Sequence, residues 1–522
     1  MNRWLWPALL LITAGALALR VPALDQRPMH ADESVHAVKF LGLWHDGVYR
    51  YDPNEYHGPS LYYATLPLAW LSSARLPSEL SDATLRLVPV CFGVGLILLL
   101  AFLADGLGRP AVLFAGLFTA VSPAMVFYSR YYIHEMLLVF FTLLFLVSAW
   151  RYSQSGRLAW AFAAGIGLGL MHATKETFVF SIVAIAAAIV LCRLLDRWHL
   201  AGREPATPLF WRTRDLVLGA VAALVVSVVL FSSFFSNWAG PLDSVRTYLP
   251  WLSRAGGQSP HVHPWSFYFE RLLFFHPAKG FVWTEAWVVL LALVGVAAGF
   301  TGKGLGDANP RLVRFLACYT ITLTMAYCAL AYKTPWCLLG FYHGMILLAG
   351  IGATVLLRLA KPPLLRPVYV LFMLAACGHL VCQAWWATHS YASDRRNPYV
   401  YAHTSSDLLR LVERVRAVAK SASSQNETQI NVITPNGDYW PLPWYLRQFK
   451  RVGWWDHLES NPYAPIMIVG TKLGADLDER SNKKWLMTGM FELRPKVFLE
   501  LYVEYGLWKR YLETRPPPKD EE

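Results

Sequence analysis

The sequence predicts a mainly α-helical membrane protein: a bundle of about eleven transmembrane helices at residues 1–387, then a small α/β domain at residues 388–522. Two observations lead to this prediction. The 522 residues are 55% hydrophobic and only 16% charged, and the apolar runs are long enough to cross a bilayer. Beyond about residue 388 hydrophobicity falls, and short segments typical of a soluble domain replace the long runs.

In a soluble protein, the net charge of +12 would suggest a nucleic acid partner. Here the Lys and Arg residues are spread over short connections between apolar runs, where membrane topology places them. We therefore expect contact with anionic membrane lipids and no nucleic acid. The seven Cys residues form no CxxC motif and lie in or beside apolar runs, so neither a disulfide framework nor a zinc site is expected.

The first apolar run, Trp4 to Leu19, is predicted to be a retained transmembrane helix. A cleaved signal peptide is the alternative, because an Ala-Leu-Ala sequence near its end could be a cleavage site. A retained helix is favoured, since everything that follows stays hydrophobic. Ten further spans are expected at residues 84–104, 111–127, 134–150, 158–173, 177–192, 215–235, 284–300, 314–331, 336–357 and 367–387.

Alternate loops differ in their content of Lys and Arg, and cytoplasmic loops normally carry the excess. The basic, short connections are those near residues 3, 109, 151–157, 193–214, 303–314 and 358–366. We therefore place the N-terminus in the cytoplasm and the protein in the plasma membrane. With eleven spans, the loops at 20–83 and 236–283 and the C-terminal domain lie on the exterior, periplasmic side.

The first exterior loop contains two segments, ESVHAVKFLGLWHDG and PSLYYATLPLAWLSS, that are apolar on one side but too short or too polar to span. They are predicted to be interfacial helices that frame a groove, and simple loop packing is the alternative. In the C-terminal domain, residues 405–421 and 441–449 read as helices, and residues 429–434 and 465–470 as buried strands. We expect this domain to shape acceptor access rather than to carry chemistry.

The stretch from Met29 to His36 holds two adjacent acids between two histidines, directly after the first apolar run. Ionisable groups so close to a bilayer are costly and mark a candidate functional site. On a helix the side chains of Asp32 and Glu33 diverge by about 100°, so they cannot share one task. His36 returns to the face of Asp32. The alternative is that Asp32 only caps the following helix.

Two further exterior loops place an acid beside a base: one holds Arg130 and Glu135, and the other holds Lys175 and Glu176. Three such loops suit sugar transfer from a polyprenyl-phosphate donor. A carboxylate accepts the proton of the acceptor hydroxyl, and cations stabilise the charge that grows on the leaving phosphate. Asp32 is the candidate base.

The candidate phosphate contacts are Arg130, Lys175, Arg271 and Lys333. The alternative for each is a side chain that reaches toward lipid headgroups. Exterior histidines and carboxylates could also bind a divalent cation, although no HExxH or comparable spacing is present. Hydrogen bonding within a polar vestibule is the favoured alternative. These histidines are His30, His36, His57, His134, His172, His261 and His263.

Several motifs resemble those of one superfamily: HADESVHA, YDPNEYHGPSLYY, RYYIHE, ATKET, YKTPW, NPYVYAHTS and WPLPWYLR. They look like GT-C glycosyltransferases of the protein O-mannosyltransferase and aminoarabinose transferase type, and most of all like the flippase-activity-associated proteins of that superfamily. The similarity spans nearly the whole chain. It implies a catalytic Asp at Asp32, a second acid at Glu135, a lipid-linked sugar donor and inversion at the anomeric carbon.

We take Asp32, Glu33 and Glu135 as candidate catalytic residues. The candidate substrate-binding residues are His36, His57, Arg130, His134, Lys175, Glu176, Arg271 and Lys333. The expected partners are a polyprenyl-phosphate-linked sugar and a lipid, glycan or protein acceptor, with no resident metal or other cofactor assigned. The alternative from another class is a non-catalytic membrane factor that binds or helps translocate lipid-linked sugars. A carboxylate base is needed only by the enzyme.

Overall fold

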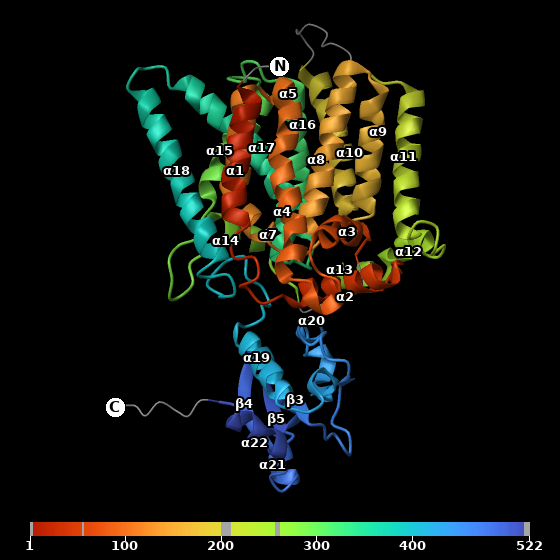
Figure 1. Ribbon diagram of the computed structural model, residues 1–522. Helices are drawn as coiled ribbons and strands as arrows, with labels where there is room; N and C mark the ends of the chain where they lie inside the picture. The colour runs from red at the N-terminus through yellow and green to blue at the C-terminus, as the bar shows by residue number, and fades with distance from the viewer. Residues whose placement is uncertain (1–3, 55–56, 200–209, 256–260, 516–522) are drawn as a thin grey trace.

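Long helices stand side by side in the upper part of the molecule, and a small sheet hangs beneath them (Figure 1). The computed structural model describes residues 4–54, 57–199, 210–255 and 261–515. The N-terminal end lies at the top of the bundle, whereas the sheet lies beyond its opposite face. The predicted fold class is confirmed, because the described chain is mostly helical and carries a small sheet near its C-terminal end.

All eleven predicted spans coincide with helices. Within the described residues, seven helical segments are long and apolar enough to cross a bilayer, so the chain is a multi-pass membrane protein. They contain α4 (Asp82–Leu99) extended by η2 (Leu100–Leu103) and α5 (Ala104–Leu107), α8 (Glu135–Ser155), α10 (Phe178–His199), α11 (Thr213–Phe231), α16 (Pro310–Ala329), η3 (Pro335–Leu338) with α17 (Leu339–Leu359), and α18 (Leu365–Thr388). Four shorter apolar helices supply the other spans: α1 (Leu5–Arg20), α6 (Arg109–Val121), α9 (Leu158–His172) and α15 (Ala286–Thr301).

The span predicted at residues 111–127 is broken into two helices. Pro123 has no backbone N–H with which to continue α6, so a new helix, α7 (Pro123–Tyr128), starts there. The hydroxyl of Ser122 accepts a hydrogen bond of 3.2 Å from the backbone N–H of Met125 and caps α7. This helix leads directly into the RYYIHE loop.

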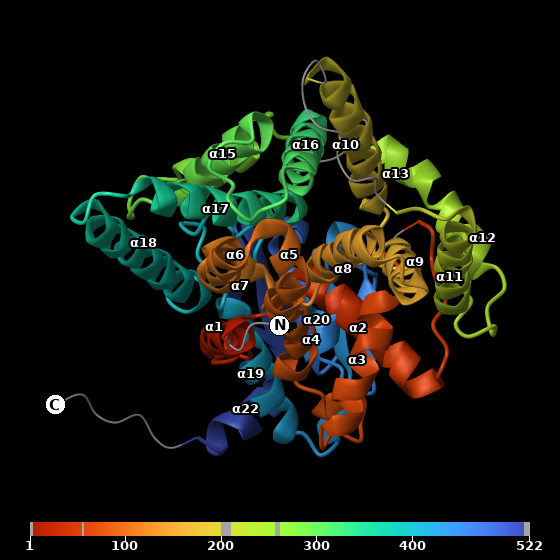
Figure 2. The same cartoon turned by 90° about the horizontal axis from the view of Figure 1, so that it is seen from above.

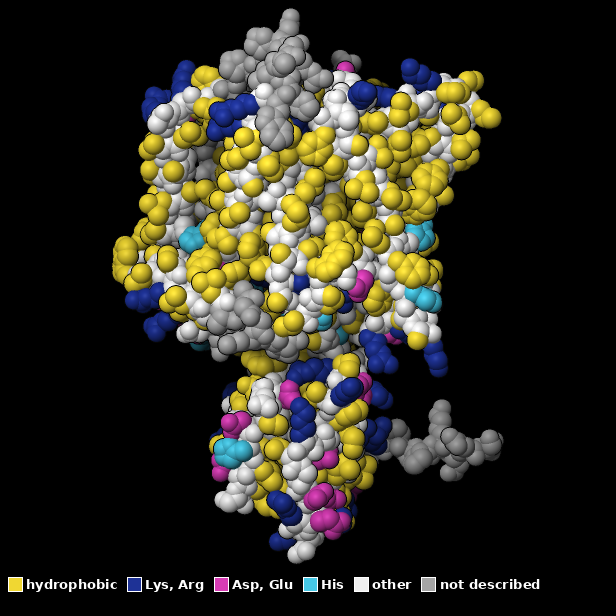
Figure 3. Space-filling model, turned by 180° about the vertical axis from the view of Figure 1, so that it is seen from behind, with side chains coloured by type: hydrophobic (Ala, Val, Ile, Leu, Met, Phe, Trp, Pro, Cys, Tyr) yellow, Lys and Arg dark blue, Asp and Glu magenta, His cyan; other side chains and the backbone are white. Residues whose placement is uncertain are grey.

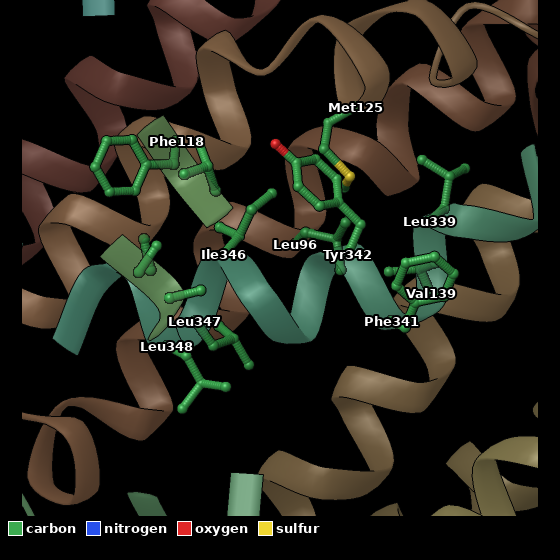
Figure 4. Close-up of a cluster of buried hydrophobic side chains, with 14 of the residues drawn as sticks. Leu96, Phe118, Met125, Val139, Leu339, Phe341, Tyr342, Ile346, Leu347 and Leu348 are labelled. Carbon is green, nitrogen blue, oxygen red and sulfur yellow. The ribbon is translucent and has the colours of Figure 1, made fainter. Parts of the chain in front are cut away.

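Helix α17 lies at the centre of the bundle. In its span 94% of the residues are buried, compared with 17% in the span of α10. Figure 4 shows side chains of α17 such as Phe341 in one buried cluster with Leu96 and Met125. At Gly352, α17 approaches α15 so closely that a Cβ would lie 1.9 Å from the carbonyl oxygen of Leu291. These contacts make α17 a rigid support for the loops below it.

The two helices predicted in the first exterior loop are present as α2 (Ala31–Asp46) and α3 (Ser60–Leu71). Both lie at the lower end of the bundle, to one side of α4 (Figures 1 and 2). Three further helices, α12 (Gly240–Arg246), α13 (Tyr248–Ala255) and α14 (Phe267–Leu273), lie near the same end. The sequence did not predict them, because about two turns are too few for a helical period to stand out.

The sheet below the bundle has five strands in the order β2-β1-β3-β5-β4, with β1 to β3 parallel and β5 antiparallel to β3 and β4. The sequence predicted β1, β3 and two helices, α19 and α20. It missed β2, β4 and β5, whose partly exposed side chains give no continuous apolar run. The bounds are α19 (Asp407–Lys420), β1 (Ile430–Ile433), α20 (Leu442–Tyr445), β2 (Val452–Trp455), β3 (Ile466–Gly470), α21 (Leu477–Arg480), β4 (Trp485–Arg494), β5 (Val497–Glu504) and α22 (Tyr505–Glu513). The domain boundary at residues 387–388 stays a prediction.

Apolar side chains cover the waist of the bundle, and Lys and Arg side chains gather toward its upper and lower rims (Figure 3). This pattern is typical of a protein embedded in a bilayer. The orientation stays a prediction, and part of the basic loop at 193–214 lies outside the described residues, as does residue 3.

Cysteine labelling tests the predicted orientation. Ser424→Cys in the unit that carries the sheet should react with an impermeant thiol reagent in intact cells, because this unit is expected outside. Lys303→Cys, between α15 and α16, should react only after the membrane is opened. Both positions are exposed. A background with Cys91 and Cys382 replaced by Ser removes the two exposed native thiols. Labelling of position 303 but not of position 424 in intact cells would reverse the orientation.

Candidate active site

Asp32 stands in the first turn of α2, but it does not cap this helix. Nδ1 of His30 accepts a hydrogen bond of 3.1 Å from the backbone N–H of Asp32, and the backbone N–H of His30 donates to Glu33 at 2.9 Å. The alternative that Asp32 is only a helix cap is therefore wrong. The Asp32 side chain is 49% exposed, and its carboxylate lies 3.8 Å from Nδ1 of His30.

Glu33 is fully buried, and both of its carboxylate oxygens are occupied. Arg27 and Arg86 form ion pairs with it at 2.8 and 2.9 Å. The backbone N–H groups of His30 and Tyr132 also donate to it, at 2.9 and 3.0 Å. Burial opposes the ionisation of Glu33, but the two guanidinium groups outweigh burial and hold the pKa of Glu33 well below its usual range. The two adjacent acids thus differ in their surroundings. The Asp32 carboxylate is half exposed, whereas the Glu33 carboxylate is buried and paired with two arginines.

Arg130 is also tied into the protein. Its guanidinium group donates to the backbone carbonyl oxygens of Arg20, Pro22 and Ala23 at 2.6 to 3.0 Å. The residue is only 5% exposed. Three of its five N–H donors are therefore used to hold the chain that follows α1. This arrangement conflicts with the predicted phosphate contact.

The RYYIHE and ATKET loops meet beside α2. Glu135 and Lys175 form a buried ion pair. Burial opposes the charge on Lys175, but the Glu135 carboxylate outweighs burial and raises the pKa of Lys175 above its ordinary value. Next to this pair in sequence, the carboxylate of Glu176 lies 2.8 Å from Nδ1 of His57. The structure therefore brings both predicted acid and base loops to one place.

Three imidazole rings form a cluster at this meeting point. The ring of His134 lies 4.6 Å from that of His36 and 5.3 Å from that of His57, centroid to centroid. Nδ1 of His36 lies 3.0 Å from the hydroxyl of Tyr62, and Nε2 of His134 donates to the carbonyl of Gly58 at 2.8 Å. Burial, reinforced by His57, lowers the pKa of His36 to about 3, so its ring is neutral near pH 7.

The charge of Asp32 influences the pKa values of His36, His261 and Tyr332. These groups come from α2 and from two separate loops, so segments far apart in the sequence come near Asp32. Of the eight predicted site residues outside α2, His57, His134, Lys175 and Glu176 lie near His36, on the helix of Asp32. Arg130 does not belong to this group, for the reason given above.

Lys333 and Arg271 lie beside the same loops. Nζ of Lys333 donates to the carbonyl oxygen of His263 at 3.1 Å and to that of Leu330, and burial lowers the pKa of this lysine. The guanidinium of Arg271 lies over the ring of Phe267, with Cζ 3.5 Å from the centroid. Tyr401 was not predicted as a site residue, although it belongs to the NPYVYAHTS motif. The hydroxyl of Tyr401 lies 2.8 Å from a ring nitrogen of His261 and of His263.

Across the parts of the chain that the structure describes, no three His, Cys, Asp or Glu side chains are arranged to hold a metal ion. His36, His57 and His134 instead have partners in a tyrosine, a glutamate and a backbone carbonyl. The cation site and the polar vestibule both stay predictions.

Solved structures of membrane enzymes share this architecture. ArnT from Cupriavidus metallidurans bound to undecaprenyl phosphate matches over 95% of this chain and 98% of that chain, with a TM-score of 0.60 and 15% identity. The chain has the GT-C fold. The Archaeoglobus fulgidus oligosaccharyltransferase tethered with an acceptor peptide matches over 87% of this chain, with a TM-score of 0.52 and 13% identity. This chain spans 64% of the length of that oligosaccharyltransferase.

A family model described as dolichyl-phosphate-mannose-protein mannosyltransferase matches residues 60–242. This segment of the GT-C fold runs from α3 to α12 and contains the RYYIHE and ATKET loops. No curated protein sequence matches the chain. The resemblance to the GT-C superfamily is thus confirmed, whereas the special likeness to the flippase-activity-associated group stays a prediction.

Proposed function

We propose that the chain is an inverting glycosyltransferase that moves a sugar from a polyprenyl-phosphate donor to an acceptor on the exterior face of the membrane. One observation carries this proposal: the carboxylate of Asp32 is half exposed, and it lies, together with Lys175, near Tyr332, the residue before Lys333. The name of the matching family includes dolichyl-phosphate-mannose, and the ArnT structure contains undecaprenyl phosphate. Both names support a lipid-linked donor.

In the proposed reaction Asp32 accepts the proton of an acceptor hydroxyl. The hydroxyl oxygen attacks the anomeric carbon on the side opposite the phosphate. The bond between that carbon and the phosphate oxygen breaks, and polyprenyl phosphate leaves with the electron pair. A single displacement of this kind inverts the anomeric carbon. Glu33 is unsuited to the same task, because four donors already occupy its oxygens.

A cation must then stabilise the negative charge on the departing phosphate. Lys333 is the best candidate, since Nζ has three donors and two of them point at carbonyl groups, which carry no full charge. Arg271 is the second candidate, because the structure gives it an aromatic neighbour rather than a carboxylate. Lys175 is already neutralised by Glu135. We propose that this ion pair holds the RYYIHE and ATKET loops together on the acceptor side of the site.

Lys333→Ala is expected to weaken donor binding by about tenfold, because a charge-assisted hydrogen bond to phosphate contributes roughly 1.5 kcal/mol or more. The loss should appear in the donor Kd as well as in the rate, since the phosphate is charged before and after transfer. Binding of a labelled donor to purified protein measures it. Lys303→Ala, in the exposed loop between α15 and α16, is the matched control. Unchanged donor affinity in Lys333→Ala would remove this lysine from the phosphate site.

The non-catalytic alternative uses the same candidate cations but requires no base. A factor that only binds or translocates lipid-linked sugars needs the cations and the groove but no proton acceptor. Lipid and glycan extracts from cells with and without the protein separate the two. The enzyme predicts that one sugar modification disappears while its polyprenyl-phosphate donor accumulates. If every modification persists and only the sidedness of the donor changes, the alternative holds.

A further inference from the structure

The position of Asp32 is set by the backbone around it. Its own carboxylate is half exposed and has only the 3.8 Å contact with His30. The segment from Met29 to Ser34 must therefore be held by other groups if the carboxylate is to meet a substrate in one fixed geometry. Misplacement by about 1 Å can lower a rate by about 100-fold.

Part of this support comes from hydrogen bonds with the unit below the bundle, which carries the sheet. The backbone N–H of Met29 donates to the hydroxyl of Tyr445 at 2.8 Å. The hydroxyl of Ser34 donates to the carbonyl oxygen of Pro441 at 3.3 Å, and the hydroxyl of Thr404 donates to the carbonyl oxygen of Met29 at 2.7 Å. Groups more than 370 residues away in sequence thus bracket Asp32 on both sides.

The short helix α20 is itself anchored on the bundle. The indole N–H of Trp444 donates to one carboxylate oxygen of Asp82 at 2.6 Å, and the hydroxyl of Tyr445 donates to the other at 3.3 Å. Arg447 lies over the Trp444 ring, 3.6 Å from its centroid, and donates to the carbonyl oxygen of Leu80 at 2.6 Å. Tyr445 is only 7% exposed. Its hydroxyl therefore links the start of α4 to the segment that carries Asp32.

We infer that Tyr445 is a positioning residue for the reaction proposed above: the unit that carries the sheet fixes Asp32 through α20. This inference rests on the proposed function. It gives this unit a direct part in the chemistry, beyond the expected shaping of acceptor access.

Tyr445→Phe removes the hydroxyl and leaves the ring. In the full-length protein we expect kcat to fall about 10- to 100-fold while the donor KM changes by less than about twofold, because the base is displaced and the phosphate site is untouched. Hydrogen–deuterium exchange of the backbone amides at residues 29–34 should become faster, since the N–H of Met29 loses its acceptor. Tyr463→Phe is the matched control, because that ring stacks on Trp485 within the same unit.

Two outcomes would overturn the inference: unchanged exchange at residues 29–34, or a kcat equal to that of the control variant. If Tyr445→Phe is poorly folded, Asp82→Asn carries the same test, because it weakens the anchor of α20 without touching the ring. A wild-type protein with no transfer activity would refute the proposed function instead. The exchange measurement would then still decide whether Tyr445 holds the segment around Asp32.

Discussion

Asp32→Asn is expected to lower the rate of sugar transfer by about 10²- to 10⁴-fold while the protein stays folded and binds donor. The amide has nearly the shape of the carboxylate but cannot accept a proton. The substitution should cost little stability, because His30 caps α2 and Asp32 is half exposed. A change within about 0.5 kcal/mol is typical of such surface positions. The measurement is transfer of labelled sugar, with donor binding and thermal unfolding of the same preparation.

Asp46→Asn is the matched control for this prediction. Asp46 is the last residue of the same helix, and its side chain is 68% exposed beside His45. It has no part in the proposed site, so its transfer rate should equal that of the wild type. Full activity in Asp32→Asn would remove the base from Asp32 and favour the non-catalytic factor.

Glu33→Gln is expected to destabilise the fold rather than to affect the chemistry selectively. The substitution removes the negative charge that pairs with Arg27 and Arg86, and all three groups are buried. Breaking a buried ion pair by removing one partner typically costs about 3–5 kcal/mol, since a charge is left uncompensated. The yield of monodisperse protein in detergent and its unfolding temperature should both fall well below those of Asp32→Asn.

The contrast between these neighbours is the informative feature. Glu33 was predicted as a candidate catalytic residue, and the structure instead surrounds it with donors. If Glu33→Gln purifies with the unfolding temperature of the wild type and loses only activity, Glu33 acts in the chemistry after all. Partial rescue of stability by a second substitution that removes the charge of Arg27 would support the ion-pair explanation.

The bundle could be predicted from the sequence because hydrophobic length is a local signal. Each of the eleven runs coincides with a helical segment, and the stop at Pro123 divides one of them. The helices α2 and α3 could be predicted because their apolar residues recur on one side. The helices α12 to α14 and the strands β2, β4 and β5 could not, because they are short or only partly buried.

The candidate site was predictable only in part. The pattern of acids beside bases in three loops led to Asp32, Glu135 and Lys175, and the fold brings these loops together. The partners of Glu33 and Arg130 could not be predicted, because Arg86 lies 53 residues from Glu33 and the carbonyl partners of Arg130 lie more than 100 residues away. The link from Tyr445 to Met29 spans 416 residues. A contact of this kind depends on tertiary structure alone.

Transfer from a doubly labelled donor tests the role of Asp32 most directly. Purified wild-type protein and Asp32→Asn are placed in proteoliposomes with a polyprenyl-phosphate sugar labelled in both the sugar and the prenyl chain, and with membrane acceptors. The wild type is predicted to join the labelled sugar to an acceptor and to release one labelled polyprenyl phosphate for each sugar, whereas Asp32→Asn binds the donor and forms no product. Equal transfer by both proteins would contradict the role of Asp32 as the base. Movement of intact donor across the bilayer without product in the wild type would contradict the proposed glycosyltransferase activity.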